Sequence, residues 1–408
     1  MAEGLVYPQS NAKKVVMVRY GELFLKSEPV KYHFIGILLR NIGKALSAAG
    51  LSYHSETPRG RILLYGDEPV KIAAITARVF GVVDVSVCTL TAAEPDALCV
   101  EAIGLASVHL QAPMSFAVRA KRQNKVGMNS QELGAYVGSA IYDHIPGLRV
   151  DLDTPDYELF VEMRDVGGLV YDTRIPAPGG LPWGTQGRVI ALLSSGIDSP
   201  VASWLSMKRG CEVIHLHMDG RRWAGEDVRE AAIENLRRLS LWCPGYPMQM
   251  IIADSEPLYE AMQQCRVAPR YRCVICKRFM IRVGARLLEP ENAYALITGE
   301  NLGQVASQTL ANLAIISEVV AVPVLRPVIT YDKSEIITIS RRIGTFDTHP
   351  GDLACRAVPR MPTTAATLDP IKEGEEKIGI DDLVEHAISS VRYVIALNGE
   401  ITGLDQES

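Results

Sequence analysis

A run of small residues directly after an apolar segment is the part of this sequence best suited to chemistry. Residues 188–193 have the character of a buried strand, and residues 194–200 follow as Ser-Ser-Gly-Ile-Asp-Ser-Pro. Backbone N–H groups of small residues can converge on an anion, and a helix N-terminus adds partial positive charge. Asp198 would lie beside the phosphates, where a carboxylate is suited to bind Mg²⁺. We therefore expect a nucleotide site; the alternative is an ordinary helix start, with Ser199 as N-cap and Pro200 as first helical residue.

Two cysteines in a C-x-x-C arrangement form a second candidate site. Cys273 and Cys276 are compatible with a redox pair, half of a zinc site, cluster ligands or two buried thiols. The cations around them favour thiolates; they are Arg270, Arg272, Lys277 and Arg278. Cys355 lies far downstream in a turn-rich stretch, and we expect the other five cysteines to be structural.

A cluster of cations forms a third candidate site. Four positive charges fall within seven residues, where a predicted strand ends: Arg119, Lys121, Arg122 and Lys125. Such a cluster can grip phosphates without reading sequence, although an ordinary charged loop is the alternative. No aromatic platform accompanies it, so an RNA partner would be recognised by its shape.

The elements that carry these residues follow from the hydrophobic patterns. A strand at 15–18, a helix over 34–46 and a strand at 61–65 predict a first α+β unit over residues 1–68. A second unit over 69–174 is predicted from a helix at 72–80, strands near 82–90, 114–118, 159–163 and 169–171, and a helix after residue 128. Asn129 and Glu132 can form a capping box for that last helix.

The second half of the chain has a different texture. Residues 175–187 are rich in proline and glycine and are predicted to be a linker. Strands are predicted at 188–193, 212–218, 247–252 and 293–298, with helical stretches between them. This alternation predicts a parallel sheet with helices on both faces over residues 188–408, ending in an acidic, helix-like segment.

Composition narrows the class of protein. Of the 408 residues, 48% are hydrophobic and 22% charged, which excludes wholesale disorder, and no apolar run is long enough to span a membrane. Eight cysteines are too few for a disulfide framework, and no secretory signal is visible, so we expect a cytoplasmic protein. Residues 1–126 carry 15 Lys and Arg against 10 Asp and Glu, although the whole chain is at −5; a polyanionic partner would prefer this part.

The run at 194–199 resembles the PP-loop of ATP pyrophosphatases, whose usual form is Ser-Gly-Gly-x-Asp-Ser. Ser195 replaces the first glycine. If that position requires a positive φ, serine costs strain of about 1 kcal/mol. In this superfamily ATP activates a carbonyl oxygen as an adenylate and releases pyrophosphate.

Further motifs resemble the tRNA 4-thiouridine synthetase (ThiI) family. They are Arg19-Tyr-Gly-Glu22, Phe116 to Arg122, Gly299 to Thr309, Leu325-Arg-Pro327 and Asp332-Lys-Ser-Glu335. The resemblance covers roughly residues 15–360. It implies an α/β PP-loop (adenine nucleotide alpha hydrolase-like) parallel-sheet domain, preceded by ferredoxin-like and THUMP domains that are α+β.

The resemblance also implies roles for particular residues. Asp198, Lys333 and Cys355 would be catalytic, with Lys333 stabilising charge on the phosphoryl group; an ion pair with Asp332 is the alternative. The cluster at 119–125 would bind tRNA. ATP would be bound by Leu192, Leu193, Ser194, Ser195, Gly196, Ser199, His217, Met218, Lys277, Gly299 and Gln308. A metal pair of His215 and His217 is a less favoured alternative.

No counterpart of the carboxyl-terminal rhodanese domain of some family members is recognised in these 408 residues, so we expect a member similar to the rhodanese-lacking archaeal type. Cys273, Cys276 and Cys355 resemble the three cysteines that bind an iron–sulfur cluster in those members, so the resemblance implies a [4Fe–4S] cluster here. A Cys355 disulfide and a structural zinc are the alternatives. Sulfide or a cysteine desulfurase would donate sulfur, and a homodimer is expected by analogy.

The resemblance predicts a tRNA uracil 4-sulfurtransferase that adenylates a uridine at position 8 and then inserts sulfur. It also links the family to sulfur supply for the thiamine thiazole. The alternatives are a PP-loop thiolase for another tRNA base, an amide-forming synthetase, and a non-catalytic RNA-binding protein with a degenerate nucleotide site.

Overall fold

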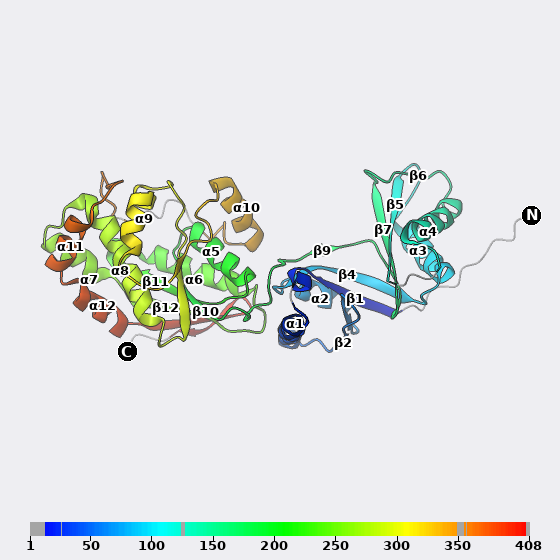
Figure 1. Ribbon diagram of the computed structural model, residues 1–408, viewed down its shortest axis with the longest axis horizontal. Coiled ribbons are helices and arrows are strands. Elements are labelled where there is room, and N and C mark those ends of the chain that lie inside the picture. Colours follow the sequence, from blue (N-terminus) through cyan, green and yellow to red (C-terminus); the bar gives the residue numbers. More distant parts are fainter. Residues whose placement is uncertain (1–12, 26, 124–126, 349–354, 356, 405–408) are drawn as a thin grey trace, which may run out of the picture. The chain divides into compact units, whose positions relative to one another are not determined.

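The computed structural model describes residues 13–25, 27–123, 127–348, 355 and 357–404 (Figure 1). It divides into two compact units. The first contains residues 1–22, 46–78 and 82–179, and the second contains residues 23–45, 79–81 and 180–408. Within the described residues, no helix is long and apolar enough to cross a membrane.

The first unit is built on a nine-stranded sheet. The strand order is β2 (His54–Glu56), β3 (Ile62–Tyr65), β1 (Lys13–Tyr20), β4 (Val82–Thr91), β8 (Gly167–Tyr171), β7 (Tyr157–Arg164), β5 (Ser115–Arg122) and β6 (Arg149–Val150), with β9 (Ile175–Pro176) beside β4. Residues 15–18 are fully buried, as their β-branched run predicts. Because β1 pairs with both β3 and β4, the sheet continues through the predicted boundary at residue 68.

Three helices pack on this sheet. Helix α2 (Pro69–Thr76) contacts β1 and β4, whereas α3 (Pro95–His109) and α4 (Ser130–His144) contact each other and the strands β8 and β5. The predicted capping box begins α4: the Asn129 side chain accepts from the Glu132 N–H, and the Glu132 carboxylate accepts from the Asn129 N–H. Helix α3 was not predicted from the sequence.

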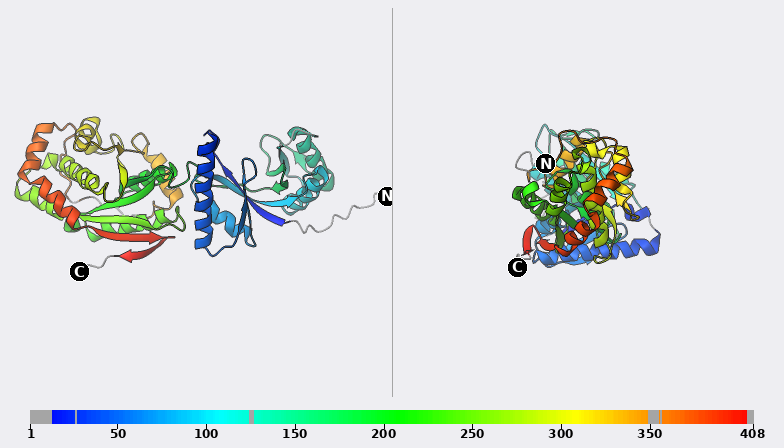
Figure 2. Two further views of the ribbon diagram at one scale, coloured as in Figure 1. Left: turned by 60° about the horizontal axis from the view of Figure 1, so that its bottom comes forward. Right: turned by 90° about the vertical axis from the view of Figure 1, so that its left-hand side faces the viewer.

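The second unit is an α/β sheet with helices on both faces (Figures 1 and 2). The strand order is β14 (Val324–Leu325), β13 (Ala293–Ile297), β10 (Arg188–Leu192), β11 (Glu212–Asp219), β12 (Met248–Asp254), β15 (Arg392–Leu397) and β16 (Glu400–Leu404). The five strands from β14 to β12 are parallel; four of them were predicted, and the short strand β14 was not. Alternate residues of β10 serve two cores: Ile190 packs on one face, and Val189 and Ala191 pack on the other.

Helices surround this sheet. They are α5 (Asp198–Lys208), α6 (Glu226–Ser240), α7 (Glu256–Gln264), α8 (Arg272–Leu287), α9 (Leu310–Ser317), α10 (Lys333–Ile343), α11 (Leu368–Lys377) and α12 (Ile380–Ser389), with short 3₁₀ turns at 221–223, 269–271 and 306–308. Helix α1 (Glu28–Ala48), which follows the short turn Glu22–Leu25, clusters with this unit through residues 28–45. Its Asn41 amide donates to the Trp183 carbonyl, and the Tyr246 hydroxyl donates to Asn41 Oδ1.

The end of the chain differs from the helix-like segment predicted for it. After α11 and α12, strands β15 and β16 form an antiparallel hairpin that extends the sheet beyond β12 (Figure 2). The turn is Asn398-Gly399, with φ of 51° and 85°. Asn-Gly with two positive φ angles is the preferred two-residue hairpin turn, so the signal was present in the sequence.

Candidate active site

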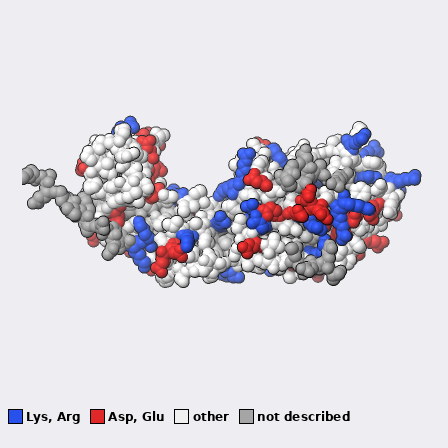
Figure 3. Space-filling view, turned by 180° about the vertical axis from the view of Figure 1, so that it is seen from behind, with Lys and Arg blue, Asp and Glu red and all other residues white. Residues whose placement is uncertain are grey.

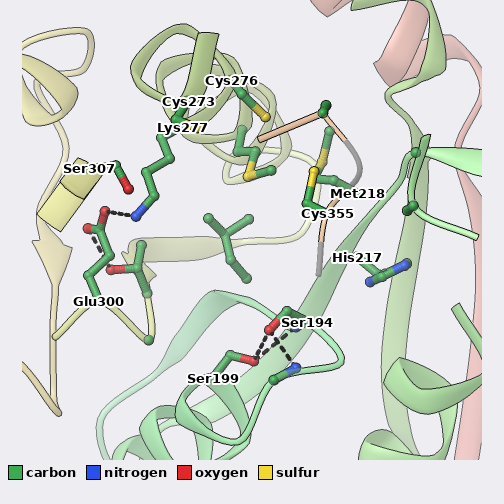
Figure 4. Close-up of a pocket in the computed structure, with 18 of the residues that line it drawn as sticks. Ser194, Ser199, His217, Met218, Cys273, Cys276, Lys277, Glu300, Ser307 and Cys355 are labelled. Carbon is green, nitrogen blue, oxygen red and sulfur yellow. Dashed lines mark hydrogen bonds and ion pairs between the residues drawn. The ribbon is translucent and has the colours of Figure 1, made fainter. Parts of the chain in front are cut away.

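A cavity of about 500 Å³ lies at the carboxyl ends of β10, β11 and β13. All eleven residues predicted to bind ATP line it, as do Asp198 and the three cysteines of the second candidate site. Ligands of α/β proteins bind in the crevice outside the carboxyl ends of the parallel strands, where the N-termini of the following helices also lie. Figure 4 shows Ser194 and Ser199 at one end of the cavity, the cysteines at the other, and Lys277 and His217 on opposite sides.

The loop between β10 and α5 is held by its own serines. The Ser199 hydroxyl accepts from the Ser194 N–H at 2.9 Å and lies 2.9 Å from the Ser194 hydroxyl, which accepts from the Gly196 N–H. Helix α5 begins at Asp198, and its N-cap residue, Ile197, supplies no capping side chain. The alternative role of Ser199 as N-cap is therefore wrong. The first N–H groups of α5 have no capping side chain, which suits an anion.

Ser195 and Gly299 define how tightly this loop is packed. Within the described residues Ser195 is not among the non-glycine residues with positive φ, so the strain considered for it does not arise. A Cβ atom on Gly299 would lie 2.7 Å from both the Ser199 nitrogen and its Cα atom. Gly299 thus allows the segment after β13 to approach the start of α5 closely.

Asp198 and Lys333 meet at the loop. The Lys333 ammonium donates to both Asp198 carboxylate oxygens, at 3.0 and 3.2 Å, and the Gln304 amide donates to Asp198 Oδ2 at 3.2 Å. Asp332 instead caps α10 with Glu335, so the alternative Asp332–Lys333 ion pair does not form. The structure places a cation and a carboxylate together at this loop, although their catalytic roles remain predictions.

Glu300, a buried carboxylate that was not singled out in the sequence, orders the cavity wall that carries Lys277. Glu300 accepts from Lys277 at 2.9 Å, from Arg326 at 2.7 Å and from the Thr298 hydroxyl at 3.1 Å. Burial by itself would raise the pKa of Glu300, but Lys277 and Arg326 outweigh it and hold that pKa below its usual value. Glu300 directly follows Gly299, so the motif around it was the available signal.

The two histidines of β11 are neutral, buried side chains. Burial lowers the pKa of His215 to about 4 and also lowers the pKa of His217. His217 Nδ1 bonds to the Leu193 carbonyl at 2.9 Å, whereas Nε2 is buried without a partner among the described residues. Of the two, His217 lines the cavity.

The three cysteines face the same cavity from two segments: Cys273 and Cys276 from α8, and Cys355 from the segment before α11. Cys276 is buried, Cys273 is half-buried and Cys355 is exposed. The Tyr259 hydroxyl, which the sequence did not suggest, lies 3.4 Å from the Cys276 sulfur. Burial raises the pKa of Cys276 to about 12 and also raises that of Cys273. The prediction that nearby cations keep these two cysteines as thiolates is therefore wrong for the protein without a bound ligand or metal.

The thiols supply a donor set that suits an iron–sulfur cluster, because three sulfur atoms line one cavity. In the described part of the chain, however, no three His, Cys, Asp or Glu side chains group closely enough to hold a metal ion. All eight cysteines are free, so the alternative disulfide is not formed.

The predicted RNA-binding cluster is partly paired. Arg119 donates to Glu158 at 2.8 Å and to the Leu152 carbonyl at 2.7 Å, and Arg122 donates to the Met128 carbonyl. Lys121 is exposed, and Lys125 lies outside the described residues. The face of the α3–α4 lobe seen in Figure 3 is mainly uncharged.

The parallel sheet, the small-residue loop and the cavity beyond it define an α/β protein of the PP-loop class. The chain belongs to the family described as thiamine biosynthesis protein (ThiI), which matches residues 184–380. The ThiI ferredoxin-like domain matches residues 15–86, and the THUMP domain matches residues 92–171.

Relatives match along almost the whole chain. Proteins described as probable tRNA sulfurtransferases from Methanosarcina mazei and Moorella thermoacetica are each 36% identical over 93% of this chain and cover 95% and 97% of their own lengths. A crystal structure of a 4-thiouridine synthetase–RNA complex with bound ATP is 30% identical, with a TM-score of 0.81 over 94% of this chain and 100% of that chain.

Proposed function

We propose that this protein is an ATP-dependent tRNA uracil 4-sulfurtransferase that converts a uridine, at position 8, to 4-thiouridine. The observation that carries the proposal is the single cavity that has a phosphate loop at one end and three cysteines at the other. Activation of a carbonyl and delivery of sulfur need both sets of groups beside the same base. The relatives named as tRNA sulfurtransferases and the synthetase–RNA structure with bound ATP support the same substrates.

In the first step, uracil O4 attacks the α-phosphorus of ATP, and pyrophosphate leaves. The residues expected to bind pyrophosphate are those of the loop, through backbone N–H groups and the start of α5. Asp198 would hold Mg²⁺, which neutralises phosphate charge, and Lys333 would stabilise charge on the transferring phosphoryl group. In the protein alone, these two side chains neutralise each other.

In the second step, a sulfur nucleophile attacks C4, and AMP leaves with O4. A [4Fe–4S] cluster held by Cys273, Cys276 and Cys355 would supply an iron that can carry sulfide. The alternative is a Cys355 persulfide, whose terminal sulfur bonds to C4. Cys273 or Cys276 then attacks the Cys355 sulfur, breaks the S–S bond and forms a disulfide that a dithiol must reduce. Iron and acid-labile sulfide content of anaerobically purified protein separates these routes, with Cys273→Ala/Cys276→Ala as the comparison.

The remaining parts of the proposal rest on family resemblance. The domains would be the ferredoxin-like domain at residues 1–68, the THUMP domain at 69–174 and the PP-loop domain at 188–408, with 175–187 as linker. The two amino-terminal domains would dock tRNA. The protein would act in the cytoplasm. The protein would act as a homodimer with sulfide or a cysteine desulfurase as sulfur donor, and it would also supply sulfur for the thiamine thiazole.

The Asp198→Ala variant tests the first step. We expect it to lose tRNA-dependent pyrophosphate release from ATP at least a hundredfold, because the metal ligand is gone, while tRNA affinity stays within twofold. Asp227→Asn, at the start of α6, is the control because Asp227 does not line the cavity. Normal thiolation by Asp198→Ala would refute this mechanism, and mapping of the thiolated nucleoside would reveal a thiolase for another base.

A further inference from the structure

Two segments beside the cysteine end of the cavity are free of acidic residues. Residues 261–288 contain six arginines and one lysine but no Asp or Glu, and residues 355–368 contain two arginines and no acid. This composition is unusual for its surroundings, because residues 127–408 carry 27 basic against 37 acidic side chains, obtained as 42−15 and 47−10. A local excess of positive charge within an acidic half of the chain indicates a surface that meets an anion.

The two segments meet at the mouth of the cavity. Cys355 and Val358 line the cavity together with Arg272 and Cys273. The Val358 N–H donates to the Cys355 carbonyl at 3.2 Å, and a few residues later the Thr363 N–H donates to the Arg270 carbonyl at 3.0 Å. The segment from Cys355 to Thr363 therefore leads from the cysteine to the start of α8. Arg360 lies between these two anchored points.

Four arginines of these two segments form what we call the arginine rim: Arg266, Arg270, Arg272 and Arg360. Arg272 itself lines the cavity, and the other three lie near the cavity-lining residues along the chain. Arg272 is half-buried, and the other three are exposed. In the part of the chain that the structure describes, none of the four has a carboxylate partner; Arg270 lies over the Tyr271 ring, and Arg272 donates to the Val267 carbonyl. By contrast, Lys277 and Arg278 of the same acid-free segment are paired with Glu300 and Glu375.

The surroundings of the rim add to its preference for anions. Helix α8 begins at Arg272 without a capping side chain, so its N-terminus contributes partial positive charge at the same mouth. Val358 and Met361, which are 54% and 83% exposed, flank Arg360 along the chain and add exposed apolar surface to this segment. Unpaired arginines with adjacent apolar side chains suit a sugar–phosphate backbone whose bases are unstacked.

We propose that the arginine rim binds RNA phosphates that flank the target nucleotide and holds that nucleotide over the cysteines. This inference rests on the proposed function, and it adds an RNA-binding site on the second unit to the cluster predicted at 119–125. An arginine at a phosphate positions the chain without reading its sequence, so the rim would fix where the uracil enters rather than which base is chosen. An acidic partner protein is the competing occupant of such a surface.

The test compares Arg270→Gln/Arg360→Gln with Arg188→Gln/Arg286→Gln. The control removes the same charge from exposed arginines at the amino end of β10 and in the last turn of α8, neither of which lines the cavity. Affinity for an unmodified tRNA transcript is measured over a series of KCl concentrations. We expect the rim variant to bind about tenfold more weakly, with a log–log salt slope shallower by about 1.4–1.8, because each phosphate contact contributes about 0.7–0.9. The control should match the wild type.

Two further measurements keep the interpretation unambiguous. ATP affinity should be unchanged in both double variants, which shows that the second unit is folded, and Arg270→Lys/Arg360→Lys should retain the wild-type salt slope because it keeps both charges. An unchanged slope in the Gln variant would overturn the proposal. So would normal tRNA binding combined with impaired transfer from a persulfide-carrying protein, because the rim would then bind an acidic partner. Failure of the proposed function has a different signature, namely no tRNA-dependent pyrophosphate release by the wild-type protein.

Discussion

Gly299 has a packing role that no other residue type could fill in this backbone. The segment after β13 crosses the first turn of α5 so closely that a Cβ atom would overlap the Ser199 backbone. The same segment carries Glu300, which orders Lys277, and Gln304, which donates to Asp198. The geometry of the phosphate loop therefore depends on a residue that has no side chain.

The Gly299→Ala variant should disturb the loop directly. The contact is with backbone rather than with a mobile side chain, so we expect a loss of about 1–3 kcal/mol in stability and at least tenfold weaker ATP binding, measured by denaturant unfolding and calorimetric titration. Gly36→Ala is the matched control, because a Cβ on Gly36 in α1 meets nothing within 4 Å. It should leave ATP binding unchanged and stabilise by up to about 1 kcal/mol. Equal behaviour of the two variants would contradict this account.

At the scale of elements, helix α8 carries two of the cysteines and is bound to helix α11 by buried hydrogen bonds. Its amino-terminal turns carry Cys273, Cys276 and Lys277, and the next residue, Arg278, is almost completely buried. Arg278 and Arg282 each form two hydrogen bonds to the Glu375 carboxylate of α11, at 2.6–3.1 Å. Gly374 lets α11 lie close to α8, since its Cβ would be 2.9 Å from Ile275.

Replacing Glu375 with Gln should destabilise the second unit strongly. The change leaves the buried Arg278 without its main counterion, which typically costs about 3–5 kcal/mol. Glu376→Gln is the control, because Glu376 is exposed on the same helix and should change stability by less than about 0.5 kcal/mol. Denaturant unfolding of both variants at neutral pH decides the question. Similar midpoints for the two would show that the arginine–carboxylate network contributes little.

At the scale of the whole molecule, acid stability depends on a carboxylate inside the first unit. Glu162 of β7 is buried and accepts from Arg61 at 3.2 Å, from Arg164 at 2.7 Å and from the Tyr171 hydroxyl at 3.2 Å. Burial by itself would raise the pKa of Glu162, but Arg61, Arg164 and Arg19 outweigh it and lower that pKa from 4.5 to about 2. Arg19, the first residue of a family-like motif, is thus a buried structural cation.

The depressed pKa predicts how stability changes with pH. The stabilisation from Glu162 is complete above the unfolded-state pKa of 4.5 and is lost as pH falls toward about 2. A shift of this size corresponds to about 3 kcal/mol. Glu162→Gln should therefore lower stability by about that amount at pH 7 and flatten the profile between pH 4.5 and 2. Glu158→Gln, half-exposed on the same strand, is the control; a steep acid profile retained by Glu162→Gln would contradict the assignment.

Local patterns in the sequence were sufficient for the features whose parts are neighbours along the chain. The strand, small-residue loop and helix at 188–208 are contiguous, so their order predicts an anion site without knowledge of the partners. The Asn129 capping box needs residues only three positions apart, and four of the five parallel strands follow from runs of apolar residues. These signals depend on backbone geometry and on which side of an element is buried.

Only the tertiary structure decided which distant residues meet. Lys333 pairs with Asp198 from 135 positions away, and Glu375 pairs with Arg278 from 97 positions away. The Tyr259 hydroxyl likewise reaches the cysteine end of the cavity from a segment that no local motif connects to it. The physical reason is that an amphipathic pattern specifies a buried face but not its neighbour. The neighbour is determined by the strand order, which juxtaposes strand ends and helix starts that are far apart in the sequence.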